Sequence, residues 1–312
     1  MSENSKDLFV LFLQVAGIPE NRISPYFEEF VKTGGSMEEF SRSKLLKECP
    51  NIFLERMLIR LSKTYDDLEL RERIEHAMNG PFPDVKGDLH IHTEWSDGTY
   101  PVELYAKKAE KMGYHYLTIT DHSLVGKGTV QMDAYKFLKQ VEYVKKIQNK
   151  FNLRILQGVE IDINEDGTLD YPSKILEKAD IVLGAVHFDY GKGEEKAFEL
   201  LKSLLKNKHV NVIAHPLNKI GEKTFKKHLD EVIEMAKRYG KALEISLVPD
   251  RIQESDFLVE NLKDSGVKFS FGTDSHSVKQ LELMRISNLW LNDLNEDLIA
   301  NFYENPIEFL ED

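Results

Sequence analysis

Seven short apolar runs alternate with amphipathic stretches after residue 86, and this alternation limits what the 312-residue chain can fold into. The runs have the length of buried strands, and they span residues 87–92, 115–121, 154–161, 181–187, 210–215, 242–247 and 267–272. Apolar residues at helical spacing fill the intervals 102–112, 132–150, 194–207, 225–239 and 256–265. Such alternation is typical of parallel β/α units. Seven strands in so short a stretch favour a closed barrel, although their number alone leaves an open sheet as an alternative.

The first 80 residues have a different pattern, without strand-like runs. Apolar residues recur at helical spacing in FVLFLQVAG, in YFEEFV and in residues 52–61. The segment Asn79-Gly80-Pro81-Phe82-Pro83 ends this pattern, since proline and glycine stop helices. We therefore predict a small all-helical N-terminal domain over residues 1–80 and an α/β domain over residues 84–312.

Side chains that can bind metal ions lie at the carboxyl ends of six of the seven predicted strands or just after them. In a β/α barrel these ends share one rim, where active sites form. Imidazole selects zinc, manganese or iron, whereas magnesium sites are built from oxygen. The set exceeds what one or two ions need, and it predicts a multinuclear metal hydrolase. Its members are His90, His92, Asp97, His122, Glu160, His187, His215, Asp274 and His276.

Local context suggests roles for some of these side chains. His90 and His92 point to the same side of an extended strand, because side chains alternate with a period of two. A carboxylate can bridge two ions, and we therefore predict that Glu160 is the bridging ligand. Asp121 stands beside His122, where a carboxylate often orients a ligating ring.

Taken singly, several members have a simpler interpretation. Asp97 fits a turn aspartate, and His187 and His215 fit buried core histidines. Only the joint pattern favours a metal site over these interpretations. We expect the histidines outside the pattern to be structural or to lie on the surface: His76, His115, His209 and His228.

The motifs DLHIHTEWSDG, TITDHS, GVEIDINEDGTLDYP, VHFDY, IAHP, ALEIS, PDR and GTDSHS resemble the PHP (polymerase and histidinol phosphatase) superfamily over about residues 84–300. Within it, the chain is most similar to the C-terminal PHP module of family-X DNA polymerases. This resemblance implies a distorted (β/α)7 barrel with a site for three divalent ions, zinc, manganese or iron. It implies one ion held by His90, His92, Glu160 and Asp274, a second held by Glu160, His187 and His215, and a third held by Asp97, His122 and His276.

The reaction that the resemblance implies is hydrolysis of phosphoesters by metal-activated water. Lys219 and Arg251 follow the fifth and sixth runs, and both are candidates for binding the substrate phosphate. The family tends to have an arginine near the position of Lys219, and an ammonium group binds phosphate less directionally than a guanidinium group. For both residues, an ordinary surface cation is the alternative interpretation.

The substrate is predicted less sharply than the reaction. Family-X polymerases carry a polymerase domain ahead of the PHP module, and 80 residues are too few for one. We expect a stand-alone phosphoesterase that acts on nucleotides or DNA 3′ ends, as a 3′–5′ exonuclease does. A phosphomonoesterase of a small metabolite, such as a nucleoside phosphate or histidinol phosphate, is the alternative. The net charge of −12 favours a small substrate and disfavours tight duplex DNA binding.

Two other classes of function are less consistent with the residues. Amidohydrolases also begin with two histidines on the first strand, but their sites typically end in a lone aspartate rather than in Asp274-Ser275-His276. A non-catalytic, metal-stabilised module for binding partners would be favoured by lost ligands, and none is missing. The chain has no apolar run of 18 residues, no signal peptide pattern and a single cysteine, Cys49, so we expect a cytoplasmic protein without a membrane span.

Overall fold

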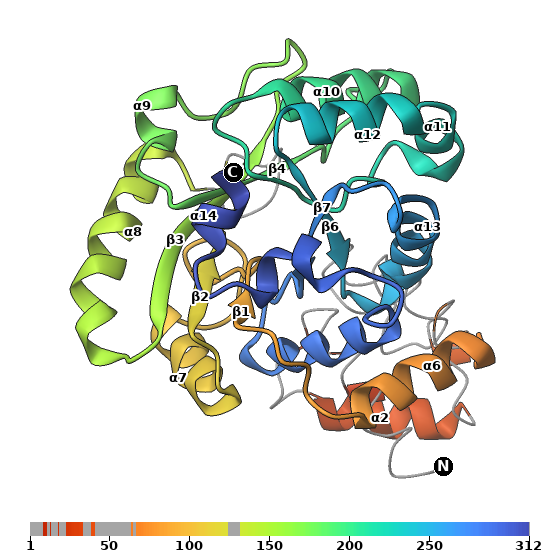
Figure 1. Cartoon of the computed structure of the whole chain (residues 1–312). Coiled ribbons are helices and arrows are strands. Elements are labelled where there is room, and N and C mark those ends of the chain that lie inside the picture. The colour runs from red at the N-terminus through yellow and green to blue at the C-terminus, as the bar shows by residue number, and fades with distance from the viewer. Residues whose placement is uncertain are drawn as a thin grey trace.

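The computed structural model describes residues 9–10, 13, 18, 23–33, 39–40, 64, 67–123 and 132–311. Seven parallel strands form one sheet in which each strand pairs with the next along the chain (Figure 1). The strands are β1 (Gly87–Asp88), β2 (Tyr116–Ile119), β3 (Arg154–Asp162), β4 (Ile181–Ala185), β5 (Val212–Ile213), β6 (Ala242–Ser246) and β7 (Lys268–Gly272). All seven predicted strands are present, although β1 and β5 are much shorter than predicted.

The sheet curls until its first and last strands approach each other. Near the carboxyl ends, Ile91 and Ser275 form a parallel bridge, and the His92 N–H donates to the Ser275 carbonyl at 2.8 Å. The Asn301 amide also spans the gap between β1 and β7, since its nitrogen donates to the carbonyls of Gly87 and Phe271, both at 3.0 Å. The predicted distorted seven-stranded barrel is therefore confirmed as a nearly closed barrel.

Helices surround this barrel on its outer side (Figure 1). Helix α10, for example, packs against β4 and β5 and buries Phe198, Leu201 and Leu204, while α11 and α12 pack against α10. The predicted helix over residues 225–239 is instead two helices that meet at His228. The helices that follow the strands are α7 (Val102–Met112), α8 (Ala134–Ile147), α9 (Ser173–Leu176), α10 (Glu194–Lys206), α11 (Gly221–Lys227), α12 (Leu229–Arg238) and α13 (Ile252–Leu262).

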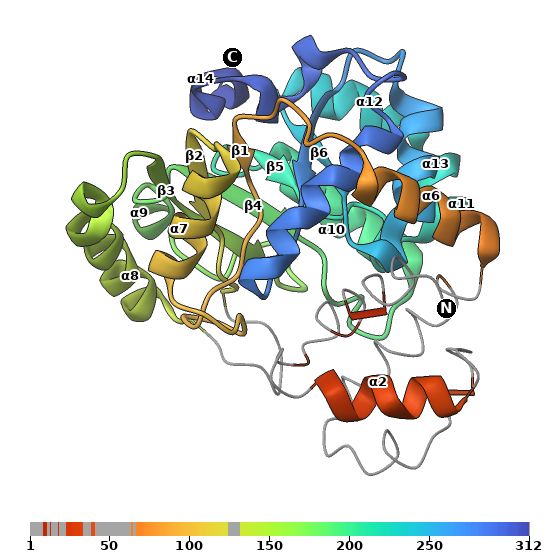
Figure 2. The ribbon, with the colours of Figure 1, turned by 90° about the horizontal axis from the view of Figure 1, so that it is seen from below.

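After β7 the chain forms short elements that periodicity did not predict: η4 (Val278–Leu289), η5 (Glu296–Leu298), η6 (Ala300–Phe302) and α14 (Pro306–Glu311). Helix α6 (Leu68–Asn79) packs against η4, and Figure 2 shows it beside α13. The Arg73 guanidinium on α6 donates two hydrogen bonds to the Asp256 carboxylate on α13, at 2.9 and 2.8 Å. Helix α6 thus contacts the barrel, and the predicted domain boundary after residue 80 stays a prediction.

Farther toward the N-terminus, α2 (Ile23–Lys32) is confirmed as a helix. Phe30 of this helix stacks on Phe9 with ring centroids 3.9 Å apart, and Phe40 meets both rings edge-on. The predicted helix over residues 52–61 and Cys49 lie outside the described residues. No helix among the described residues is both long enough and apolar enough to cross a membrane.

Candidate metal centre

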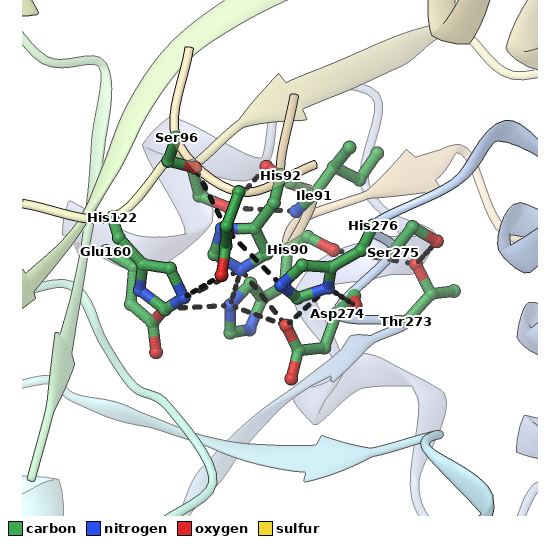
Figure 3. Close-up of polar contacts among 12 residues, drawn as sticks. His90, Ile91, His92, Ser96, His122, Glu160, Thr273, Asp274, Ser275 and His276 are labelled. Atoms are coloured by element: carbon green, nitrogen blue, oxygen red, sulfur yellow. Dashed lines mark hydrogen bonds and ion pairs between the residues drawn. The ribbon is translucent and has the colours of Figure 1, made fainter. Parts of the chain in front are cut away.

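The predicted ligands converge at the carboxyl ends of the strands. Figure 3 shows His90, His92, His122, Glu160, Asp274 and His276 pointing toward one another. Three overlapping groups have ligand atoms close enough together to hold a metal ion, and they contain eight of the nine predicted ligands, all except His215. The groups are His92, Asp97, His122 and His276; His90, His92 and Asp274; and His122, Glu160 and His187.

The first predicted group has the spacing of a tetrahedral site. His90 Nε2 and His92 Nε2 are 3.0 Å apart, and His92 Nε2 lies 3.0 Å from Asp274 Oδ1. Glu160 Oε2 lies 3.5 Å from His90 Nε2 and 3.6 Å from His92 Nε2. Ligand atoms about 2.05 Å from a tetrahedral zinc ion would be about 3.3 Å from one another. His90, His92 and Asp274 therefore fit one such ion, and Glu160 Oε2 lies near the two histidines of that group.

The other oxygen of Glu160 faces a second set of histidines. Glu160 Oε1 lies 2.8 Å from His215 Nε2 and 3.4 Å from His187 Nε2. The two oxygens of one buried carboxylate therefore point at two different groups of imidazoles. This arrangement fits the predicted bridging role of Glu160.

The third predicted group surrounds Asp97. Its Oδ1 lies 3.4 Å from His276 Nε2, and its Oδ2 lies 3.7 Å from His122 Nε2. The other ring nitrogen of His122, Nδ1, is 2.7 Å from Glu160 Oε2, although neither atom has a hydrogen bond with suitable geometry. His122 thus stands between two groups, and the division of the ligands among three ions stays a prediction.

Two carboxylates orient predicted histidine ligands through Nδ1, the ring nitrogen that does not face the centre. Glu244 Oε1 on β6 lies 2.6 Å from His90 Nδ1, and Asp162 Oδ1 lies 2.7 Å from His187 Nδ1. Such contacts fix the ring so that Nε2 faces the metal. Sequence analysis missed the role of Glu244. A charged residue in the middle of the apolar run 242–247 was the signal that could have revealed it.

The backbone leaves little room around Glu244. Its Oε2 accepts the His215 N–H at 2.7 Å, so this one carboxylate contacts ligands from two different strands. A Cβ atom on Gly272 would lie only 1.9 Å from Glu244 Oε1. The ligands His215 and Asp274 also have positive φ angles, 28° and 50°, which are costly for residues other than glycine.

We predicted that Asp121 orients the ring of His122, but the structure shows that its carboxylate binds other residues. Its carboxylate is buried and accepts the backbone N–H groups of Thr93 at 2.7 Å and of Ser96 at 3.1 Å. It also accepts hydrogen bonds from both of their hydroxyls and from Gln140. Asp121 therefore holds the loop that carries Asp97, and its catalytic role stays a prediction.

The two predicted phosphate-binding cations occupy different environments. Arg251 is mostly buried, and its Nη1 lies 3.8 Å from Asp274 Oδ2 without a hydrogen-bond partner. Lys219 is exposed and has a φ of 66°. No ion pair joins Lys219 to the centre within the part of the chain that the structure describes. Arg251 thus lies beside the predicted ligand Asp274, and the phosphate-binding role of both cations stays a prediction.

Facing charges set the pKa values of the ligands. Burial lowers the pKa of His187, but Glu160 and Asp162 outweigh this effect and raise it to about 10. Burial raises the pKa of Glu160, but His122, His187 and His90 hold it well below the usual value. Burial lowers the pKa of His92, and the positively charged neighbours His122 and His276 lower it further, to about 4. The carboxylates are therefore ionised, as metal ligands must be.

Comparison with known proteins identifies relatives of this chain. The PHP domain family matches residues 88–247. The "DNA polymerase/3'-5' exonuclease PolX" of Bacillus subtilis (strain 168) is 34% identical over 289 residues, which are 90% of this chain and 49% of that protein. The chain thus spans about half the length of this relative. Because 90% of the chain exceeds what residues 81–312 contain, the match extends into the N-terminal helical region.

A "probable phosphatase" of Thermoanaerobacter sp. (strain X514) is 34% identical over 230 residues, which are 69% of this chain and 89% of that protein. Among solved structures, histidinol phosphate phosphatase from Lactococcus lactis, complexed with zinc, L-histidinol and phosphate, has a TM-score of 0.52 at 21% identity. The match covers 70% of this chain and 97% of that structure. At this identity, the likeness supports the fold alone.

Proposed function

Because this chain belongs to the PHP domain family, we propose that it is a metal-dependent phosphoesterase with a site for three divalent ions. The observation that carries the proposal is the position of Glu160. Its two oxygens face separate groups of imidazoles, as a carboxylate shared by two ions would. Relatives called phosphatase or exonuclease support phosphoester hydrolysis.

The side chains of the centre would have separate roles in this reaction. When bound, the ions would supply a water of lowered pKa and neutralise charge on the phosphate oxygens. Glu244 and Asp162 hold the rings of His90 and His187 in place. Arg251 Nη1, which lies 3.8 Å from Asp274 Oδ2 and has no hydrogen-bond partner, would bind a phosphate oxygen at the edge of the centre.

We propose nucleotides or DNA 3′ ends as the substrate, and a small phosphomonoester as the alternative. The first is supported by the match with PolX, which extends into the N-terminal helices. The alternative is supported by the phosphatase relative, which this chain matches over 89% of that protein's length, and by the net charge of −12. Under either proposal, Lys219 stays a candidate for binding the substrate phosphate.

The test uses the full chain loaded with zinc or manganese. Mononucleotide release from a labelled oligonucleotide is compared with phosphate release from a panel of phosphomonoesters. We expect the double variant His90→Ala, His92→Ala to lose activity, and the variant of an exposed histidine on α6, His76→Ala, to keep it. Full activity in the double variant, or metal binding without turnover of any phosphoester, would contradict the proposal. The second result would favour a non-catalytic module.

A further inference from the structure

Two exposed aromatic side chains follow the metal ligand His187 at the end of β4. Phe188 is 37% exposed and Tyr190 is 38% exposed, whereas most large apolar side chains among the described residues are buried. Their ring centroids are 6.2 Å apart, and the planes are tilted by 49°. Because the rings do not stack face to face, neither one covers the other fully.

The structure holds Tyr190 in an unfavourable backbone conformation. Its φ is 54°, a value that is rare for a bulky residue, and Gly191 and Gly193 after it also have positive φ values of 71° and 79°. The Tyr190 hydroxyl donates to the Ile163 carbonyl at 2.8 Å, which fixes the ring at the end of β3. Such strain persists only where surrounding contacts maintain it, and it is common at functional sites.

Both ends of this aromatic segment connect to the metal centre. Phe188 is the next residue after His187, so their Cα atoms are about 3.8 Å apart. Ile163, which anchors Tyr190, directly follows Asp162, the carboxylate 2.7 Å from His187 Nδ1. The segment that carries the two rings therefore borders the proposed active site.

The charges around the two rings are unsuited to a phosphate. Asp189 lies between them in the sequence, and Asp162, Asp170, Glu165 and Asp166 all act on the Tyr190 hydroxyl and, after burial, raise its pKa. The nearby Lys192 is paired with Glu165. A neutral, planar group fits this surface better than a chain of phosphates does.

We propose that Phe188 and Tyr190 form a stacking surface for the planar ring of the substrate, while its phosphate lies at the metal centre. This inference rests on the proposed phosphoesterase function. A nucleobase is the group that we favour, because aromatic side chains stack on any base. An imidazole shares this chemistry, and the test separates the two.

The experiment compares three substrates with the metal-loaded full chain: adenosine monophosphate, histidinol phosphate and ribose 5-phosphate, which has no aromatic ring. We expect Phe188→Ala to lower kcat/KM for adenosine monophosphate by about 5- to 100-fold, mainly through KM, and to leave ribose 5-phosphate unchanged. Phe188→Trp should retain activity because it keeps an aromatic face. Tyr239→Ala is the matched control, since Tyr239 is also 38% exposed but follows α12, which leads to the opposite end of the barrel.

Each outcome bears on one of the two proposals. An equal loss for all three substrates, or no loss for any, overturns the stacking surface and leaves the phosphoesterase function standing. A larger loss for histidinol phosphate than for adenosine monophosphate overturns the choice of a nucleobase. If the wild-type protein hydrolyses none of them and also releases no mononucleotide from the labelled oligonucleotide, the proposed function fails. The stacking surface is then tested by equilibrium binding of adenosine, which Phe188→Ala must weaken and Tyr239→Ala must not.

Discussion

The lack of a side chain at Gly272 allows Glu244 to reach the metal ligands, and Gly272→Ala tests this directly. The added Cβ would lie 1.9 Å from Glu244 Oε1 and 2.9 Å from His90 Cβ. Gly272 lies at the end of β7 and has no positive φ, so alanine is compatible with its backbone conformation. The effect must therefore come from displacement of the buried carboxylate.

The expected magnitude follows from what Glu244 contacts. Its two oxygens hold His90 Nδ1 at 2.6 Å and the His215 N–H at 2.7 Å. Loss of a carboxylate that orients a metal-bound histidine typically costs about 10- to 100-fold in metal affinity. Overpacking a core position costs about 1–3 kcal/mol in the free energy of unfolding. We expect both effects in Gly272→Ala.

Gly184→Ala is the matched control. Gly184 also lies in a strand, β4, but its added Cβ would lie 2.9 Å from Leu204 Cδ2 and 3.0 Å from Val210 Cγ1, which are apolar side chains outside the barrel. Zinc affinity, measured on metal-free protein by competition with a chromophoric chelator, should fall only in Gly272→Ala. Urea unfolding of the metal-free proteins measures the loss of stability in both variants.

Two results would refute this reasoning. One is an equal change of zinc affinity in Gly272→Ala and Gly184→Ala after correction for the folded fraction. The other comes from Glu244→Gln: if Gly272→Ala acts through Glu244, combining the two substitutions should weaken zinc binding by less than the sum of their separate effects. Full additivity would show that Gly272→Ala acts by another route.

Three further predictions concern other parts of the structure. Asp256→Ala should lower the free energy of unfolding by about 2 kcal/mol in urea titrations. The substitution breaks the two-bond ion pair with Arg73 on α6, and it removes the acceptor of the Trp290 Nε1–H, which lies 2.8 Å from Asp256. An unchanged midpoint of urea unfolding would contradict this. Asp121→Asn should loosen the loop that carries Asp97 and reduce the bound zinc by about one equivalent in elemental analysis, and an unchanged stoichiometry would argue against it. The metal-free protein should lose stability as the pH rises from about 6.5, the ordinary pKa of histidine, to about 10, because the protonated form of His187 is favoured only in the folded state. Zinc affinity should rise over the same interval, since binding releases that proton, and a flat profile in both titrations would contradict the raised pKa.

Local sequence pattern predicted all seven strands, most of the barrel helices and the side chains that converge at the rim, whose role as metal ligands stays a prediction. The predicted helix over residues 102–112 matches α7 (Val102–Met112), because its periodic apolar face and the glycine after it are local signals. The strands were predicted for the same reason, because each buried apolar run has residues on both sides that end a strand. Once the strands were parallel, their carboxyl ends had to share a rim, so the convergence of His90 and Glu160 could also be predicted.

The pairing of side chains across the barrel was decided only by the tertiary structure. Glu244 and His90 are 154 residues apart, and no local signal indicates that their strands bring them to 2.6 Å. Asp121 was expected to orient its neighbour in the sequence, yet it holds Thr93 and Ser96 from another loop. The periodicity of apolar residues indicates which face of a helix or strand is buried. The contacts of Glu244 and Asp121 depend instead on strand register and on the curvature that nearly closes the sheet. The sequence therefore determined which groups would meet, and the barrel decided which atoms face each other.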